Sequence, residues 1–382
     1  RWWTTRPWNW WVVEVLHPAD DLPLHPTPAP LLHPMSDSPG LYDRYFHNGF
    51  SADGSLFFAV ALGVYPNRQV MDASFSVVVD GVQHNVRASR RCSTDRTNTA
   101  VGGIAVTVVD PMLEHRVTVD GSQEIAADLV WRAGSPVIEE PRFTRLVDGR
   151  PTLDYTRITQ FGSWSGWIEM DGTRVEIGPD TLGCRDRSWG VRGGAGLAGP
   201  ASVPQFHWLW VPTVFDDLCT HVAVNEDGDG RAWHRSGAIT ARLGSPSLDE
   251  VLDDSRVRRT TRSSVEVVWS PGTRWMSSAT VRHEQWRDDP IEVEYTPVLR
   301  FQMSGIGYLH PEWGHGSWHG EAAETRDAIV LADVDPADPT MVHVQQVCRA
   351  STGDRSGVGV FEQLVIGPHA PSGFMGLTDG AA

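Results

Sequence analysis

The 382-residue sequence contains no lysine, because every one of its 32 basic residues is an arginine. Chemistry that needs a side-chain amine is therefore excluded, including Schiff-base catalysis, pyridoxal-phosphate attachment and a P-loop. A GxSxG elbow, a glycine-rich dinucleotide fingerprint and an HExxH motif are also absent. The sequence thus gives no support to a nucleotide, flavin or covalent-serine mechanism, and we expect no cofactor.

Long apolar runs are missing as well. The longest strongly apolar run, residues 56–65, is too short to cross a bilayer, and no signal peptide is visible at the start. The four cysteines, Cys92, Cys184, Cys219 and Cys348, lack the paired spacing of a metal site. We therefore expect buried thiols in a reducing compartment, with disulfides as the alternative, and we predict a cytoplasmic protein without membrane insertion.

Positive charge is scarce relative to negative charge. The net charge of −16 argues against a nucleic-acid partner and against an anionic membrane surface. The arginines of residues 256–262 follow an acidic run at 249–254, which indicates a solvated connection. The oligomeric state stays open, with a homodimer as one alternative.

Turn-forming residues are abundant, with 37 glycines and 26 prolines. Asp-Gly pairs that begin at positions 53, 80, 120, 148 and 171 separate short β-branched or aromatic runs, which is a strong hairpin signal. Only residues 247–254 have helical character. We predict an all-β protein with a Trp/Pro-rich arm (1–40) and two sandwich or barrel domains (41–200 and 201–382), divided near the glycine-rich residues 193–200.

Aromatic residues are the richest feature, with 17 tryptophans, 12 phenylalanines and 6 tyrosines. Rings in that number either fill a very large core or line a cavity for an apolar ligand.

The stretch GCRDRSWGVR, residues 183–192, carries the first candidate site. In a strand, Asp186 and Ser188 point to one face while Arg187 and Trp189 point to the other. Asp186 and Arg192 share a face but lie about 20 Å apart in a straight strand, so they meet only if the chain turns, which Gly190 permits. Asp186 is either a catalytic carboxyl group or an anchor for nearby arginines.

A second candidate is YLHPEWGHGSWHGE, residues 308–321, in which histidines and glutamates alternate with glycine. His310, Glu312 and His315 are candidate proton carriers, and Trp313 is a candidate substrate contact. The histidine intervals are also compatible with zinc, but the arrangement of a cupin site is absent, so we assign no metal.

Two further stretches place polar groups within apolar strands. In QFHWLW, Trp208 and Trp210 share a face and His207 lies opposite, so either the aromatics fill the core or His207 points into a cavity. Glu362 lies within an apolar strand, where a lone glutamate usually faces water, yet it is a candidate substrate contact.

The two candidate stretches, together with GVGVFEQLVIGPHAPSGF (357–374), resemble the families related to hydroxyneurosporene synthase and to AttH-like lipocalin proteins. The resemblance covers residues 40–375, and its most specific element is Asp-x-Ser-Trp-Gly-x-Arg from Asp186 to Arg192. It implies two lipocalin-like barrels with a ligand cavity. It also implies cofactor-free action on large apolar molecules, as in carotenoid and isoflavonoid hydratases and cyclases of the Diels–Alder type. Arg187 stands where the resemblance leads us to expect a histidine.

We therefore predict a cofactor-free enzyme that hydrates, dehydrates, isomerises or cyclises an isoprenoid, steroid or polyketide-like substrate. Asp186 would act as the acid, with its pKa raised by burial, and Arg192 would orient it or bind a substrate oxygen. His310, Glu312 and His315 would handle the second proton. Trp189, Trp208 and Trp210 would shape the pocket, and His207, Trp313 and Glu362 are the other expected substrate contacts. The alternatives are a lipid or terpenoid carrier without turnover and a metal-dependent enzyme that uses residues 310–321.

Overall fold

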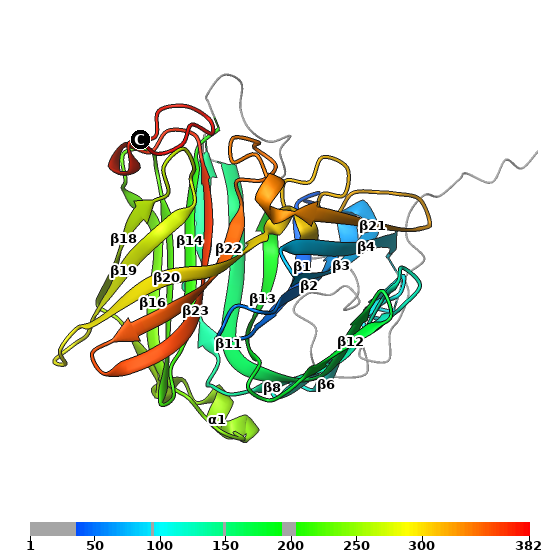
Figure 1. Cartoon of the computed structure of the whole chain (residues 1–382), viewed down its shortest axis with the longest axis horizontal. Coiled ribbons are helices and arrows are strands. Elements are labelled where there is room, and N and C mark those ends of the chain that lie inside the picture. Colours follow the sequence, from blue (N-terminus) through cyan, green and yellow to red (C-terminus); the bar gives the residue numbers. More distant parts are fainter. Residues whose placement is uncertain (1–35, 93–94, 148–149, 193–203) are drawn as a thin grey trace, which may run out of the picture.

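The computed structural model describes residues 36–92, 95–147, 150–192 and 204–382. Most of the predicted N-terminal arm and the predicted boundary near residues 193–200 lie outside these ranges. The described residues form two curled antiparallel sheets that lie side by side (Figure 1). None of their helices is long and apolar enough to cross a membrane.

The first sheet has the strand order β21-β4-β3-β2-β1-β13-β11-β8-β7-β6-β5, and the short strands β9, β10 and β12 also pair with β11. Its strands in the described residues are β1 (Leu41–Phe50), β2 (Phe57–Tyr65), β3 (Val70–Val79), β4 (Val82–Arg91), β5 (Ala100–Val101), β6 (Ile104–Asp110), β7 (Glu114–Asp120), β8 (Ile125–Ala133), β9 (Ile138–Glu139), β10 (Phe143–Val147), β11 (Arg150–Met170), β12 (Thr173–Ile177), β13 (Leu182–Arg192) and β21 (Ala322–Val330).

The second sheet has the order β17-β16-β15-β14-β23-β22-β20-β19-β18. Its strands are β14 (Phe206–Val214), β15 (Leu218–Glu226), β16 (Ala232–Ala241), β17 (Val257–Arg259), β18 (Arg262–Trp269), β19 (Met276–Glu284), β20 (Ile291–Gln302), β22 (Val344–Thr352) and β23 (Arg355–Ile366). The predicted all-β class is therefore confirmed.

Local sequence explains several turns and the single α-helix of the described residues. Asp80-Gly81 and Asp171-Gly172 close the β3–β4 and β11–β12 hairpins, and all four residues have positive φ, as a type I′ turn requires. Helix α1 (Leu248–Leu252) begins at a capping box in which Ser247 and Glu250 satisfy each other's backbone N–H groups. The helix predicted at residues 247–254 is thus confirmed.

Alternation along the central strands divides the apolar core into three layers. One layer fills the curl of the first sheet, and another, which includes Leu209 and Phe361, fills the curl of the second. The middle layer lies between the sheets and contains Tyr42, Phe46 and Tyr155 from the first sheet, and Trp208 and Trp210 from the second. Because successive side chains of a strand point to opposite faces, each central strand contributes to two layers.

One segment of the second half of the chain crosses back to the first sheet. After β20, the 3-10 helix η4 (Met303–Ile306) packs against β3 and β4, and β21 then pairs with β4 along its whole length. Figure 1 shows this orange strand beside the blue β4. The 3-10 helix η5 (Leu331–Asp333) leads the chain back toward β22. The first sheet therefore contains residues from both halves of the sequence.

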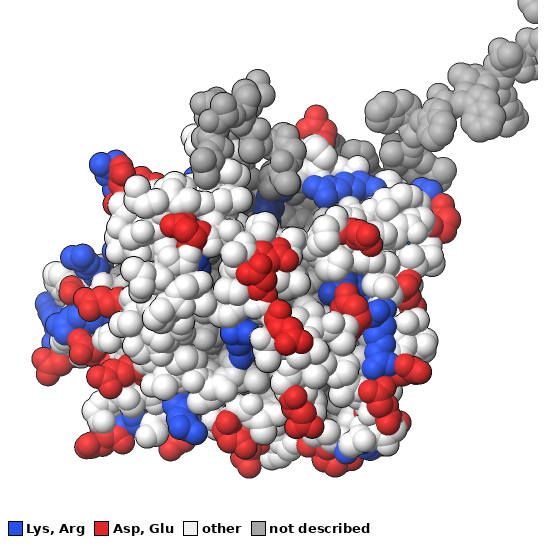
Figure 2. All heavy atoms as spheres, turned by 45° about the horizontal axis from the view of Figure 1, so that its top comes forward, with Lys and Arg blue, Asp and Glu red and all other residues white. Residues whose placement is uncertain are grey.

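The surface in Figure 2 carries acidic and basic side chains intermixed, without a large basic patch on that face. The arginines of residues 256–262 pair with nearby acids: Arg256 with Glu250 and Asp253, and Arg259 with Asp254. These groups are largely exposed, as predicted, but the segment is not a mere connection, because Val257–Arg259 forms β17 and Arg262 begins β18. All four cysteines are free; Cys184, Cys219 and Cys348 are buried and Cys92 is partly buried.

Candidate functional site

The middle layer holds an unusual concentration of charged and phenolic side chains for an apolar core, and we call it the inter-sheet cluster. The first sheet contributes three arginines, one aspartate and two tyrosines, and the second half of the chain contributes aromatic, histidine and glutamate side chains. The members are Tyr42, Arg44, Tyr155, Arg157, Asp186, Arg192, Trp208, Trp210, Tyr308, His343 and Glu362. Charged groups are costly to bury unless they are paired, so each one calls for a partner.

Asp186 stands on β13 opposite Phe46 of β1 and Thr159 of β11. Burial raises the pKa of its carboxyl group to about 6, although the charges of Arg157, Arg44 and Arg192 act in the opposite direction. The side chain keeps partial solvent contact. Among the described residues no hydrogen bond is formed by this carboxylate.

Glu140, which follows β9, differs from Asp186 because both of its carboxylate oxygens are engaged by neighbouring side chains. Arg157 binds both of its oxygens at 2.7 and 2.6 Å, the Thr159 hydroxyl donates at 2.7 Å, and His221 Nε2 lies 3.4 Å away. Burial alone would raise the pKa of Glu140, but the Arg157 charge and these contacts outweigh it and hold the pKa well below its usual range. Glu140 is thus a permanently ionised anchor for Arg157.

Glu362, on the second sheet, also has both of its carboxylate oxygens hydrogen-bonded. Trp208 Nε1 and His343 Nε2 contact Oε1 at 3.0 and 2.8 Å, and Gln345 donates to Oε2 at 2.7 Å. Burial raises the pKa of Glu362, but these hydrogen bonds bring it below its ordinary value. Asn48 of β1 donates to Gln345 at 3.1 Å, so this network joins the two sheets. The general tendency of a strand glutamate to face water does not apply here, because Glu362 is 7% exposed.

The guanidinium of Arg157 is also stacked on aromatic rings. Its Cζ lies 4.6 Å from the centre of Trp208, 5.8 Å from that of Trp210 and 4.8 Å from that of Phe143. Such contacts stabilise a buried cation through the negative faces of the rings. The tryptophans therefore already bind a cation that belongs to the protein.

Arg192 and Arg44 bring positive charge to the other side of Asp186. Arg192 donates to the Tyr42 hydroxyl at 3.2 Å and lies over the rings of Tyr42 and Tyr155 at 4.8 and 4.9 Å. The positive charge of Arg192 acts to lower the pKa of Asp186, so the two residues interact electrostatically. Gly190 has φ of 142°, and a Cβ there would lie 2.4 Å from the Asp154 carbonyl oxygen. The glycine is therefore required where β13 approaches β11.

His315 reaches the edge of this cluster and positions Arg44. Its Nδ1 lies 3.1 Å from Arg44 Nη1, and its Nε2 lies 2.8 Å from the Ile306 carbonyl oxygen. Arginine only donates and a carbonyl only accepts, so Nε2 carries the proton and Nδ1 accepts. Burial holds the pKa of His315 well below its usual range. Arg44 in turn lies over the ring of Tyr308 at 4.7 Å.

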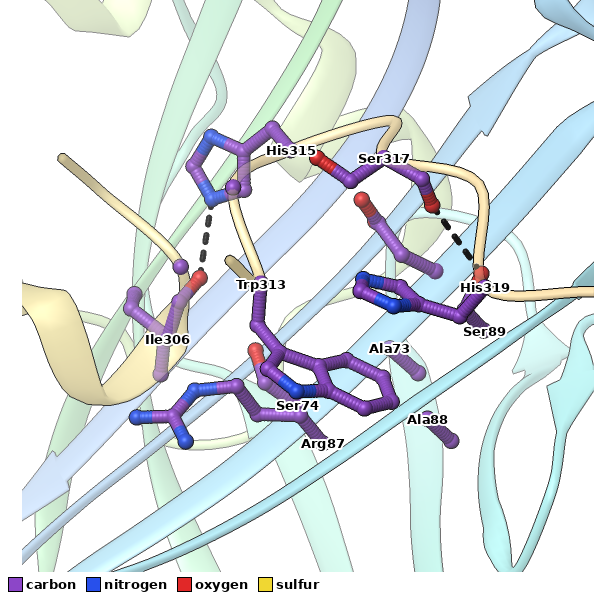
Figure 3. A pocket seen from close by; sticks show the side chains of 13 residues that line it. Ala73, Ser74, Arg87, Ala88, Ser89, Ile306, Trp313, His315, Ser317 and His319 are labelled. Atoms are coloured by element: carbon purple, nitrogen blue, oxygen red, sulfur yellow. Dashed lines mark hydrogen bonds between the residues drawn. The ribbon is translucent and has the colours of Figure 1, made fainter. Parts of the chain in front are cut away.

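The rest of the 308–321 stretch does not join the cluster. Glu312 is exposed, and His310 Nδ1 accepts from the backbone N–H groups of residues 312 and 313, which shapes the loop. Trp313 stacks on His319 with ring centres 3.9 Å apart (Figure 3). The cavity beside them has a volume of about 10 Å³, room for about one water molecule, and is too small for a large substrate.

Trp189 and His207 also lie outside the cluster. Trp189 is 42% exposed and lines, with Arg187, an open groove of about 640 Å³ near α1. His207 is buried on the face of β14 opposite Trp208, beside a cavity of about 360 Å³ in the second sheet. Burial, helped by the charge of His369, lowers the pKa of His207 to about 3, so its ring is neutral. Trp189 therefore lies on the opposite face of its strand from Asp186, and His207 on the opposite face from Trp208, as alternation along a strand predicted.

Several cluster members were not singled out from the sequence. Arg44 and Arg157 lie within strands β1 and β11, and His343 immediately precedes β22; Glu140, the partner of Arg157, follows a two-residue strand. One signal was present: Tyr42, Arg44 and Phe46 alternate with partly exposed residues in β1, so an arginine occupies a core position. The partners that explain it come from distant strands.

The fold resembles the crystal structure of an AttH-type protein from Nitrosomonas europaea, with a TM-score of 0.52, 13% identity, and coverage of 85% of this chain and 92% of that one. It also resembles kievitone hydratase from Nectria haematococca, with a TM-score of 0.51, 9% identity, and coverage of 85% and 88%. These similarities confirm the predicted pair of lipocalin-like β domains and the AttH-like resemblance.

Curated proteins give no sequence match. The family model that matches is described as "Family of unknown function (DUF8625)", and it covers residues 16–375. That span includes every member of the inter-sheet cluster, and the chain belongs to this DUF8625 family.

Proposed function

We propose that this protein is an enzyme that moves a proton to or from an apolar substrate in the inter-sheet cluster, with Asp186 as the general acid or base. The observation that carries the proposal is the contrast among three carboxylates of one layer. Glu140 and Glu362 are saturated by three or more contacts each, whereas no described residue hydrogen-bonds the Asp186 carboxylate. An uncommitted carboxyl group with a raised pKa is what general acid–base catalysis needs.

The protonation state follows from the pKa of about 6. Below pH 6 the carboxyl group is mostly protonated and donates, and above pH 6 it is mostly ionised and accepts. Arg44 and Arg192 stabilise negative charge that develops on a substrate oxygen nearby. Trp208 and Trp210 of the second sheet supply apolar surface on the opposite wall of the layer, and the Arg157 guanidinium of the first sheet stacks on them.

A second proton carrier is needed for hydration, dehydration or isomerisation. His315 is unsuited because both ring nitrogens are engaged, and Glu312 is exposed. Tyr308 is partly buried, and its ring lies beneath the Arg44 guanidinium. We assign Tyr308 this role, since tyrosine is among the side chains that serve as general acid or base. No step requires a cofactor or an amine.

Incubation in D₂O with a panel of isoprenoid, steroid and polyketide-type alkenes and alcohols tests the proposal. Mass spectrometry distinguishes gain or loss of water, deuterium exchange, and a product of unchanged mass but altered retention. We expect one of these with the parent, and a rate lower by about 10²–10⁴-fold with Asp186→Asn. Trp313→Phe, in the loop outside the cluster, is the matched control and should keep the parent rate.

Saturable binding of panel members, followed by tryptophan fluorescence, without conversion or exchange would show a carrier instead of an enzyme. Conversion that Asp186→Asn leaves unchanged would place the chemistry elsewhere. Either result contradicts the proposal.

A further inference from the structure

A second group of convergent side chains lies on the opposite face of β14, and it does not depend on the proposed function. His207, Glu226 and His369 each offer one ligand atom, and these atoms all lie within 4.8 Å of one another. In the described residues no other group of three or more histidine, cysteine or carboxylate side chains comes this close.

The fold brings these residues together from distant positions. His207 and Glu226 are direct cross-strand partners on β14 and β15. β23 flanks β14 on its other side, with Val365 opposite His207, and His369 lies four residues further along the chain. The rings of His207 and His369 stack with centres 4.1 Å apart. Local spacing in the sequence could not reveal this group, which explains why we assigned no metal there.

His207 is buried with one ring nitrogen unpartnered, as are several other histidines of the described residues. It is 4% exposed, and its Nδ1 is buried without a hydrogen-bond partner among the described residues. Buried polar atoms nearly always have a partner, so an orphaned ring nitrogen beside a carboxylate and a second histidine calls for an explanation. A bound cation would supply the missing interaction.

The surroundings provide hydrogen-bond partners for the other two ligands. His369 Nε2 lies 3.1 Å from Glu226 Oε2, and its Nδ1 lies 2.8 Å from the Ser372 hydroxyl. A serine hydroxyl can donate or accept, so Ser372 can hold the Nδ1–H tautomer that frees Nε2 for an ion. Arg235 contacts Glu226 Oε1 at 3.4 Å and leaves Oε2 for the same ion.

We propose that His207, Glu226 and His369 bind a divalent transition-metal ion whose open coordination positions face the cavity of about 360 Å³. Two histidines and one carboxylate are the donor set of catalytic zinc and non-haem iron sites. Ligand atoms around one zinc ion lie about 3.4 Å apart, given bond lengths of about 2.0–2.1 Å, so the side chains must draw together slightly on binding. Val265, Val267 and Trp269 of β18 line the far side, which fits a small, partly apolar ligand.

Equilibrium dialysis against chelator-buffered Zn²⁺, Co²⁺, Mn²⁺ or anaerobic Fe²⁺, followed by elemental analysis, tests the proposal on the intact chain. We expect about one ion per chain for at least one metal, with a Tm that rises as the free metal rises. His207→Phe keeps the stack on His369 but removes a ligand, and it should weaken binding by at least about 100-fold. Ser372→Ala should weaken binding by about 10-fold, since loss of a ligand's hydrogen-bond partner typically costs 10–100-fold.

His319→Phe is the matched control, because it also replaces a stacked histidine by phenylalanine, on Trp313, outside the site. It should bind like the parent. If His207→Phe does not fold, Glu226→Gln gives the same test through another ligand. Absence of stoichiometric binding by the parent for all four metals would overturn the proposal. So would parent-like affinity in folded His207→Phe or Glu226→Gln.

Discussion

Replacing Asp186 by asparagine should stabilise the protein at neutral pH, which is the opposite of what loss of an ion-pair anchor would do. Asparagine has nearly the shape of a protonated aspartic acid, so its effect follows the cost of ionising this buried group. The pKa rises from an ordinary 3.8 to about 6 in the folded state. At about 1.36 kcal/mol per pKa unit, this corresponds to about 3 kcal/mol, an upper value because the side chain keeps some solvent contact.

The pH dependence has a definite direction. Below pH 3.8 the group is protonated in both folded and unfolded chains, and the variant and parent should be equally stable. Between pH 3.8 and 6 the unfolded chain loses its proton first, so the parent loses stability relative to the variant. Above pH 6 the difference is complete and constant.

Urea denaturation at pH steps from 4 to 8 measures this difference, provided that the slope m is unchanged. Glu140→Gln is the matched control, because Glu140 is a buried carboxylate whose pKa is lowered. It should cost about 3–5 kcal/mol at pH 7 by leaving Arg157 unpaired, and this loss should stay nearly constant down to about pH 4.5 and shrink only in stronger acid. An Asp186→Asn variant that is several kcal/mol less stable than the parent at pH 7 would refute the reasoning and make Asp186 an arginine anchor.

Three further changes test the architecture of the cluster. Arg157→Leu should cost about 3–5 kcal/mol in urea denaturation, and combining it with Glu140→Leu should cost less than either single change, since neither member of this pair is then left buried without the other. Gly190→Ala should lower the Tm, because a Cβ there meets a backbone oxygen at 2.4 Å. Gly172→Ala is the control, since Gly172 also has positive φ but open space around it, and it should lower the Tm less. Equal decreases in Tm would contradict the steric explanation. Trp208→Phe removes one donor to a buried carboxylate and should cost about 1–3 kcal/mol by thermal or urea melts, whereas an unchanged stability would mean that water replaces the indole.

The sequence by itself determined the fold class and the facing of its strands. Asp-Gly turns fix hairpins locally, because both residues must adopt positive φ, and alternation fixes which side chains share a face. That is why Asp186 and Trp189 were correctly separated, and why Trp208 and Trp210 were correctly placed opposite His207. The capping box at Ser247 is likewise a local signal and was readable directly.

The tertiary structure decided which faces meet. Alternation cannot tell whether a face points to the curl of its own sheet, to the other sheet or to water, so Glu362 looked like a surface residue until Trp208, His343 and Gln345 surrounded it. Likewise, β21 lies in sequence between β20 and β22 of the second sheet but pairs with β4, which depends on a contact between residues more than 200 positions apart.

Both candidate sites are products of such long-range pairing. Asp186 is flanked by arginines from β1, β11 and the end of β13, and the proposed metal ligands come from β14, β15 and the residues after β23. The sequence supplies each residue and its face through local backbone geometry. Its partners, its burial and therefore its pKa depend on sheet order, which is set by apolar packing summed over the whole chain.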